Sequence, residues 1–189
     1  MKIGHVRNTK NIVSKYFMSF IKDGDVCLDA TVGNGNDIAA ISKLVGDHGK
    51  VYGFDIQNLA IDNTRELLKS QNTLGRTILI LDSHENLDKY IRESLDFIIY
   101  NLGYLPRGDK RIITNEKSTI ISIEKSLKLM RKGSIMLVTA YPGHPGGMYE
   151  NTAVSETLSR LKQKDFNVLK YDFINQKNDP PVLYAVEKL

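Results

Sequence analysis

The stretch that decides the fold runs from Val26 to Asn36 and reads V-C-L-D-A-T-V-G-N-G-N. An apolar run of strand length ends at an acid, Asp29, and passes directly into a turn that contains Gly33 and Gly35. A buried parallel strand needs a tight turn before its crossover helix, and glycine allows backbone angles and a ligand approach that a Cβ would block. The stretch therefore predicts the first strand, turn and helix of an α/β fold, with a ligand lying against the turn.

A second acid closes the next apolar run. Asp55 follows residues 51–54, which read V-Y-G-F, and lies twenty residues after Gly35. A carboxylate at that position can accept hydrogen bonds from both hydroxyls of a ribose. Acids at the ends of two strands therefore predict a nucleoside-binding cleft. The simpler alternative is that Asp29 and Asp55 cap helices and that the glycines only form a turn.

The charge of the first acid discriminates between nucleoside cofactors. The third glycine of G-x-G-x-x-G is missing because Ile38 stands in its place, so the pyrophosphate cradle of a dinucleotide site is incomplete. Asp29 would repel a pyrophosphate and would attract the cationic amino-acid end of S-adenosylmethionine. The sequence therefore favours S-adenosylmethionine as the cofactor, and an NAD-dependent oxidoreductase is a distant alternative.

The predicted cofactor-binding residues share a position at or just after the carboxyl end of a strand, where ligands bind in this kind of fold. For Ser83 and His84, a helix N-cap followed by a surface histidine stays open as the alternative. The predicted residues are Asp29, Thr31, Gly33, Asn34, Gly35, Asn36 and Asp37 after the first strand, Asp55 and Gln57 after the second, and Asp82, Ser83 and His84 after the third.

Length and composition predict one domain over residues 1–189, because a chain of 189 residues is too short for two well-buried α/β domains. The longest apolar runs are of strand length, far below the roughly 20 residues that cross a bilayer. The N-terminus is basic and polar, and the single Cys27 allows neither an intramolecular disulfide nor a Cys-based metal cluster. We therefore expect a cytoplasmic protein without a membrane partner. The net charge of +4 is compatible with nucleic-acid binding.

Apolar periodicity predicts a leading amphipathic helix over residues 11–22, within a leading segment 1–24, and then an alternation of strands and helices. Alternation forces parallel pairing through right-handed crossovers. The last two apolar runs have no helix between them and must pair antiparallel. The expected strands are 25–30, 50–55, 76–81, 95–100, 134–141, 168–174 and 182–186, and the expected helices are 36–45, 58–70, 85–91, 115–131 and 150–164.

The predicted architecture is thus α/β, with a seven-stranded and mostly parallel sheet, a C-terminal antiparallel hairpin and helices on both faces. From about residue 25 to the end, this pattern resembles the Rossmann-like class I methyltransferases. After the fourth strand, residues 101–104 read N-L-G-Y and resemble the Asn-Pro-Pro-Tyr motif of amino-group methyltransferases, with both prolines replaced. The resemblance implies that Asn101 and a backbone carbonyl accept the two protons of an amine while Tyr104 packs against the base. An Asn-Gly turn with a core tyrosine is the alternative.

Methyl transfer to an amine requires the neutral form of the amine, so a proton acceptor near the amine would help. His144 and Asp109 are the candidates for this acceptor. For His144, which lies between Gly143 and Pro145, a role in shaping the loop is the alternative.

Three stretches carry a narrower resemblance: residues 29–37 (D-A-T-V-G-N-G-N-D), 101–110 (N-L-G-Y-L-P-R-G-D-K), and 143–147 (G-H-P-G-G) together with 175–181 (N-Q-K-N-D-P-P). They are similar to the bacterial tRNA wobble-uridine methyltransferases, a family formerly described as "putative rRNA methylases". The resemblance spans essentially the whole chain. It implies N-methylation of 5-aminomethyl-2-thiouridine at the tRNA wobble position, the tRNA anticodon stem-loop as partner, and a homodimer. Thr31 departs from the superfamily, where a glycine is usual.

The motif loops also carry rings and cations suited to single-stranded RNA, which proteins read by stacking and edge contacts. The expected RNA-binding residues are Arg107, Lys110, Arg111 and Tyr141. Two alternatives stay open: a non-catalytic RNA- or nucleotide-binding module that keeps the methyltransferase fold, and a methyltransferase that acts on rRNA.

Overall fold

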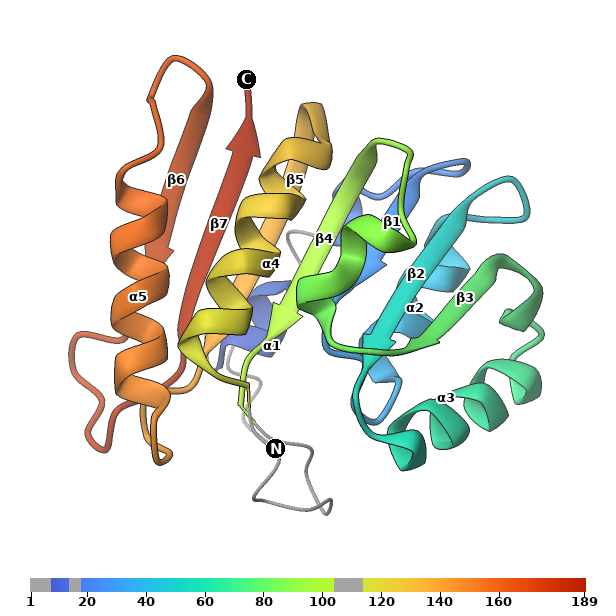
Figure 1. Cartoon of the computed structure of the whole chain (residues 1–189), viewed down its shortest axis with the longest axis horizontal. Helices are drawn as coiled ribbons and strands as arrows, with labels where there is room; N and C mark the ends of the chain where they lie inside the picture. Colours follow the sequence, from blue (N-terminus) through green and yellow to red (C-terminus); the bar gives the residue numbers. More distant parts are fainter. Residues whose placement is uncertain (1–7, 14–17, 104–113) are drawn as a thin grey trace.

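The computed structural model describes residues 8–13, 18–103 and 114–189, and the seven strands in this part of the chain form one sheet (Figure 1). The strand order is β3-β2-β1-β4-β5-β7-β6. The strands are β1 (Val26–Asp29), β2 (Lys50–Asp55), β3 (Thr77–Leu81), β4 (Leu95–Asn101), β5 (Met130–Ala140), β6 (Phe166–Tyr171) and β7 (Val182–Lys188).

Helices cover both faces of the sheet, as predicted. The α-helices are α1 (Thr9–Ile12), α2 (Asn36–Leu44), α3 (Asn58–Ser70), α4 (Glu116–Leu129) and α5 (Gly147–Ser159), and the 3-10 helices are η2 (Met18–Phe20), η3 (Leu74–Arg76) and η4 (His84–Lys89). Helices η4, α4 and α5 pack on one face, nearest the viewer in Figure 1, through apolar side chains such as Leu87, Ile123 and Val154. On the other face, α1 and α2 pack through Ile12 and Ile38.

The pairing of the strands confirms a mostly parallel sheet with an antiparallel C-terminal hairpin. Strands β3, β2, β1, β4 and β5 run parallel to their neighbours. Strand β7 is antiparallel to both β5 and β6. It lies between them, so the last strand of the chain is inserted inside the sheet and β6 forms the edge. All four parallel pairings bring the carboxyl ends of β1 to β4 to the same edge of the sheet.

Several predicted boundaries differ from those of the structure. Strand β5 begins at Met130 instead of residue 134, because the pairing with β4 continues past an irregularity that contains Gly133 at φ +78°. The short helix expected at 85–91 is the 3-10 helix η4, and α5 begins at Gly147 and ends at Ser159. Of the leading helix expected at 11–22, the structure gives α1 and η2, and residues 14–17 between them lie outside the described part.

No helix within the described ranges is long and apolar enough to cross a membrane. Cys27 is a buried cysteine with a free thiol, and burial raises its pKa further than any other influence.

A buried hydroxyl network joins β4 to the helical layer. The hydroxyl of Tyr100, which is fully buried, lies 2.7 Å from Ser122 Oγ and 2.8 Å from Ser126 Oγ on α4. Ser122 Oγ in turn donates to the carbonyl oxygen of His84, 3.0 Å away, at the start of η4. Because a buried polar group is costly unless it is hydrogen-bonded, this network fixes how α4 and η4 sit on the sheet.

Substitution Tyr100→Phe should lower the free energy of unfolding by about 1 to 2 kcal/mol, because it leaves buried serine hydroxyls short of a partner. Urea denaturation followed by circular dichroism measures this change. Tyr149→Phe is the matched control, since Tyr149 is 75% exposed and should unfold like the parent protein. Equal midpoints for all three proteins would contradict the importance of the network.

Candidate functional site

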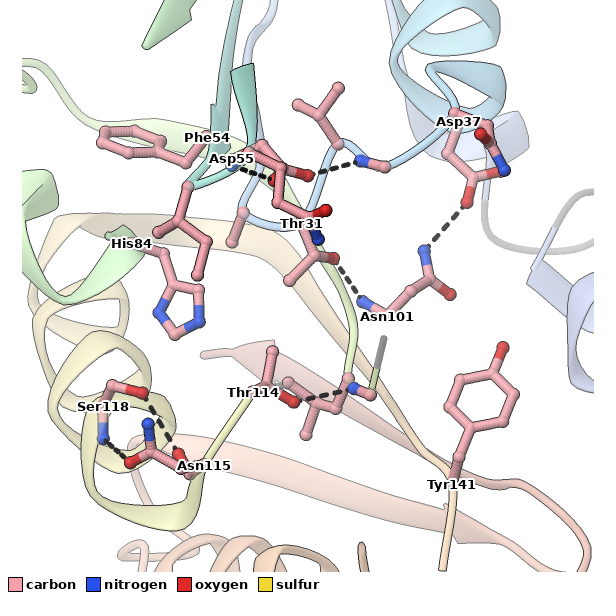
Figure 2. Close-up of a pocket in the computed structure, with 18 of the residues that line it drawn as sticks. Thr31, Asp37, Phe54, Asp55, His84, Asn101, Thr114, Asn115, Ser118 and Tyr141 are labelled. Carbon is pink, nitrogen blue, oxygen red and sulfur yellow. Dashed lines mark hydrogen bonds between the residues drawn. The ribbon is translucent and has the colours of Figure 1, made fainter. Parts of the chain in front are cut away.

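A cleft of about 660 Å³ lies at the carboxyl ends of the parallel strands (Figure 2). This volume is within the range of pockets that enclose small-molecule ligands and cofactors. The cleft brings together most of the residues predicted from the sequence. Its wall contains Thr31, Gly33, Asn34, Asn36, Asp37, Asp55, Gln57, Asp82, Ser83, His84, Asn101, Tyr141 and His144.

Asp55 at the end of β2 is held in a fixed orientation by the backbone. Its Oδ2 accepts a hydrogen bond from the N–H of Gly33 at 2.9 Å, and its Oδ1 accepts one from the N–H of Gln57 at 2.9 Å. Burial raises the pKa of this carboxyl, and these backbone donors oppose the rise. A carboxylate oxygen has more than one acceptor position. Asp55 can therefore accept further hydrogen bonds from a ligand in the cleft.

Asp29 is placed differently from what the sequence analysis expected. It is fully buried and does not belong to the cleft wall. Its Oδ1 accepts from the N–H of Thr31 at 3.1 Å, and its Oδ2 has no hydrogen-bond partner within the described residues. Burial, followed by the charge of Asp37, raises the pKa of Asp29 to about 8, so at neutral pH it is mostly uncharged. The acid that faces the cleft after β1 is Asp37.

Gly35 is likewise absent from the wall. Its φ is +77°, a conformation that favours glycine, and a Cβ at this position would lie 2.6 Å from Thr64 Oγ1 on α3. The structure therefore assigns to Gly35 the close packing of the turn against α3, and Gly33, with φ +53°, is the glycine that lies in the cleft wall.

Asn101 at the end of β4 is fixed by two hydrogen bonds. Its backbone N–H donates to Thr31 Oγ1 at 2.7 Å, and its side-chain Nδ2 donates to Asp37 Oδ2 at 2.9 Å (Figure 2). A carboxylate only accepts, so this bond orients the amide with Oδ1 available as an acceptor. Thr31, which replaces the usual glycine, thus supplies the hydroxyl that ties the loop after β1 to β4.

The end of β3 forms a third wall. Asp82 accepts from Ser83 N at 2.7 Å, from Asn86 Nδ2 at 2.9 Å and from the hydroxyl of Tyr90 at 2.9 Å. Ser83 caps η4, because its Oγ accepts from the N–H of Glu85 at 3.4 Å. The capping alternative for Ser83 is therefore observed, although the residue also lines the cleft.

His84 is not the surface histidine of the alternative interpretation. It is only 8% exposed and packs edge-on against the ring of Tyr100, with the ring centroids 5.9 Å apart. Burial lowers its pKa to about 4, so the imidazole is neutral. Its Nδ1 is buried and has no partner in the part of the chain that the structure describes. A buried polar atom in a cleft wall is a position where a ligand can supply the missing hydrogen bond.

The loop after β5 brings His144 and Tyr141 to the cleft. His144 Nδ1 lies 2.9 Å from the carbonyl oxygen of Pro145, and because a carbonyl only accepts, Nδ1 carries the proton. The ring packs closely on two glycines: a Cβ at Gly103 would lie 3.3 Å from Nε2, and one at Gly147 would lie 3.0 Å from it. His144 therefore both lines the cleft and shapes the loop.

Tyr141 faces the cleft with its hydroxyl directed toward the side of Asn101 and Asp37 (Figure 2). Burial, and then the negative charge of Asp37, raises the pKa of Tyr141, so its hydroxyl is protonated at neutral pH. The other residues predicted for RNA binding and catalysis, Tyr104, Arg107, Asp109, Lys110 and Arg111, lie outside the described residues.

The cleft also contains residues that the sequence analysis did not select. Lys10 and Val13 come from the N-terminal segment, Thr114, Asn115 and Ser118 from the start of α4, and Asp179 from the loop between β6 and β7. Asn115 does carry a sequence signal, since an Asn at the start of a predicted helix indicates an N-cap, and Asn115 Oδ1 accepts from Ser118 N at 3.2 Å. Asp179 lies within one of the stretches on which the family resemblance rests.

The order of the strands defines the class I methyltransferase fold. The cleft agrees with this class, because its wall contains the glycine turn that follows β1 and the acid that ends β2. Within that class the chain belongs to the family described as "Putative rRNA methylase", whose model matches residues 51–187.

Three relatives show the extent of the similarity. A crystal structure of a "putative rRNA-methylase" from Clostridium thermocellum has a TM-score of 0.94 and 43% sequence identity, covering 100% of both chains. A "putative methyltransferase" from Streptococcus mutans, in complex with SAH, has a TM-score of 0.88 and 34% identity over 97% of this chain and 99% of that one. A protein of Arabidopsis thaliana named "tRNA (mnm(5)s(2)U34)-methyltransferase, chloroplastic" is 32% identical over 89% of this chain, which spans 65% of the length of that relative.

Substitution Asp29→Asn should change how stability depends on pH. Because burial raises the pKa of Asp29 to about 8, the native protein retains a proton that the unfolded chain, with an ordinary carboxyl pKa near about 4, has already lost. The contribution of Asp29 to stability is therefore full below about pH 4 and is lost as the pH rises to about 8. We expect the melting temperature of Asp29→Asn, relative to the parent, to increase steadily from pH 5 to pH 8 in thermal scans.

Asp62→Asn on α3 serves as the control, because Asp62 is exposed. Its melting temperature should keep a constant offset from the parent. An Asp29→Asn curve parallel to the parent curve over the same range would show that Asp29 is already ionised in the native protein.

Proposed function

We propose that this protein is an S-adenosylmethionine-dependent methyltransferase of RNA that N-methylates the aminomethyl group of 5-aminomethyl-2-thiouridine at the wobble position of tRNA, giving 5-methylaminomethyl-2-thiouridine. The proposal rests on one observation: the side-chain amide of Asn101, which Asp37 orients, lies in the same cleft as Asp55, the acid placed to bind a ribose. Support for the substrate comes from the 32% identity to the plant tRNA methyltransferase. We also propose that the protein acts in the cytoplasm, as the sequence analysis expected.

The described residues fit S-adenosylmethionine. Asp55 would accept hydrogen bonds from the ribose hydroxyls, and Asp37 would balance the positive charge of the amino-acid end, the role that the sequence analysis gave to Asp29. The Nδ1 atom of His84, which has no hydrogen-bond partner among the described residues, lies beside Ser83 and Asp82 and would meet the polar edge of the adenine. When bound, the cofactor supplies a methyl group that is electrophilic because it is attached to a sulfonium.

Positioning of the amine is the main task of the protein in this reaction. Displacement at a methyl group requires the nucleophile to lie in line, at about 3 to 3.5 Å from the carbon. Asn101 Oδ1 and the backbone carbonyl of Leu102 would each accept one proton of the NH2 group, which aims the nitrogen lone pair at the methyl group. Because the Asp37 bond fixes the amide orientation, Asn101 presents an acceptor and not a donor to the amine.

The amine must also lose its proton before it can attack. The cleft wall is acidic, with Asp37, Asp55 and Asp179, and so attracts an ammonium ion. His144, which lies in the cleft wall, is one candidate for the proton-accepting role. Asp109 remains a candidate from the sequence.

The RNA would enter beside Tyr141 and Lys10. Tyr141 offers an aromatic ring for stacking on a base that has left the anticodon stack, and Lys10 is the cation of the cleft wall within the described residues. Tyr104, Arg107, Lys110 and Arg111 follow Gly103 in the chain and are proposed to extend this contact to the anticodon stem-loop.

Substitution Asp55→Ala should weaken the binding of S-adenosylmethionine about tenfold or more, because hydrogen bonds to a charged acceptor are worth about 1.5 to 3 kcal/mol and 1.4 kcal/mol is a factor of ten. Isothermal titration calorimetry measures the affinity, with NAD as a second ligand that should give no heat of binding. Asp62→Ala should bind like the parent. Unchanged affinity in Asp55→Ala would remove Asp55 from the ribose site.

Substitution Asn101→Ala should lower kcat for methyl transfer about 100-fold while leaving the affinity for S-adenosylmethionine within about twofold, because it removes an acceptor that positions the amine and leaves the carboxyl group of Asp37 in the cleft. The assay transfers a labelled methyl group to tRNA that carries the aminomethyl nucleoside. Asn63→Ala on the exposed side of α3 is the control and should retain full activity.

Two further arms of this assay separate the alternatives. With the parent protein, transfer to rRNA but not to tRNA would overturn the proposed substrate. Binding of both cofactor and tRNA without any transfer would indicate a non-catalytic RNA-binding module.

A further inference from the structure

The backbone of residues 101–103 is held by a hydrogen bond at every N–H. The first two bonds go to Thr31 Oγ1, at 2.7 Å, and to the carbonyl of Thr139, at 2.9 Å. The third runs from the N–H of Gly103 to Thr114 Oγ1, at 2.7 Å. The last of these lies at the point of the cleft where the proposed amine acceptors are located.

Thr114, which accepts from the N–H of Gly103, is also hydrogen-bonded to a buried acid. Its hydroxyl lies 2.9 Å from Glu150 Oε2, and its own N–H donates to the carbonyl of Gly103 at 2.9 Å. A hydroxyl has one proton, and a carboxylate offers only acceptors. When Thr114 donates its proton to Glu150, its oxygen can only accept from the N–H of Gly103. The N–H of Gly103 can only donate, so Glu150 acts on this bond by fixing the orientation of the Thr114 hydroxyl, which leaves an oxygen lone pair for Gly103.

Glu150 lies in the first turn of α5 and is only 2% exposed. Its second oxygen, Oε1, accepts from Thr119 Oγ1 on α4 at 2.6 Å. Burial of a carboxylate is costly, and apolar side chains of similar volume often serve helix packing equally well. Glu150 therefore makes two contacts with different consequences. Its contact with Thr119 joins α5 to α4, whereas its contact with Thr114 joins α5 to the cleft.

We propose that Thr114 and Glu150 are positioning residues for methyl transfer, acting on the peptide unit between Leu102 and Gly103. A peptide unit is planar and trans, so its N–H and C=O point in opposite directions and move together. Holding the N–H of Gly103 therefore orients the carbonyl of Leu102, which is the proposed backbone acceptor for the amine. This inference rests on the proposed function, because it assigns the residues that aim one of its two amine acceptors.

The test compares Thr114→Val with Thr119→Val, since both remove one hydroxyl from Glu150 and only the first touches Gly103. Thr114→Val should lower kcat about 10- to 100-fold, as expected for a misplaced acceptor, with the affinity for S-adenosylmethionine within about twofold of the parent. Thr119→Val and the conservative variant Thr114→Ser should both keep kcat within about threefold. Equal losses in the two valine variants, or full activity in Thr114→Val, would overturn the proposal.

A second measurement does not depend on activity. In protein labelled with 15N-glycine, the amide of Gly103 should exchange with solvent at least about tenfold faster in Thr114→Val than in the parent or in Thr119→Val, because it has lost its acceptor. Unchanged exchange would show that the hydrogen bond does not hold this peptide. If the parent protein transfers no methyl group to RNA, the proposed function fails while the exchange result still decides whether the relay exists.

Glu150 itself is tested by a double-mutant cycle. Glu150→Ala should lower kcat, and adding it to Thr114→Val should give little further loss, because both substitutions break the same relay. Additive losses would mean that Glu150 acts by another route. Thermal unfolding of each variant confirms that the comparison is made between folded proteins.

Discussion

Hydrogen bonds that join the ends of β2 and β4 to the loop after β1 are the interaction on which the cleft depends. Asp55, at the end of β2, accepts from the N–H of Gly33 in the loop after β1. Thr31 in that same loop accepts from the N–H of Asn101 at the end of β4. Backbone donors at the edge of a parallel sheet must find partners outside the strand ladder. In this protein, the polar side chains that accept from these donors also face the cleft. The same hydrogen bonds therefore fold the loops and place the residues of the site.

The electrostatic character of the cleft differs from that of the whole chain. The sequence carries a net charge of +4, whereas the described cleft wall contains several carboxylates and one lysine. Two groups of basic residues lie at or just after the C-terminal ends of α4 and α5: Lys125, Lys128, Arg131 and Lys132 in the first, and Arg160, Lys162 and Lys164 in the second. These ends of α4 and α5 lie opposite the carboxyl ends of the parallel strands (Figure 1). An acidic cleft suits a cationic methyl donor and an amine, and the positive charges elsewhere suit an RNA backbone. The net charge alone is compatible with nucleic-acid binding, whereas the local distribution of charge bears on the ligand of the cleft.

Most of the fold and part of the site were predictable from the sequence. Alternating apolar periods located the strands, and the parallel pairing then placed Asp55, Asp82 and Asn101 at one edge. Periodicity does not encode which strand a hairpin pairs with, so the insertion of β7 between β5 and β6 was not predictable. Contributions from distant segments, such as Lys10 and Asp179, were missed for the same reason.

The sequence also did not reveal how deeply each side chain is buried. Asp29 was expected in the cleft because it ends a strand, yet β1 is a central strand and Asp29 pairs with Gly53 on one side and Ile99 on the other. The loop that follows folds back over it, and its Oδ1 accepts from that loop. The acid that ends β1 is therefore covered by its own loop, whereas Asp37, in the first turn of α2, reaches the cleft.

The replacement of both prolines in the Asn-Pro-Pro-Tyr pattern has a physical explanation in this structure. Proline has no N–H and a φ near about −65°, which makes such a motif rigid through its rings. Gly103 has φ +121°, a conformation that proline cannot adopt, and its N–H donates to Thr114. Leu102 likewise uses its N–H, which donates to the carbonyl of Thr139. The chain thus obtains the rigidity of this segment from hydrogen bonds to β5 and to the start of α4. The geometry of the proposed amine acceptors therefore depends on residues outside the segment itself.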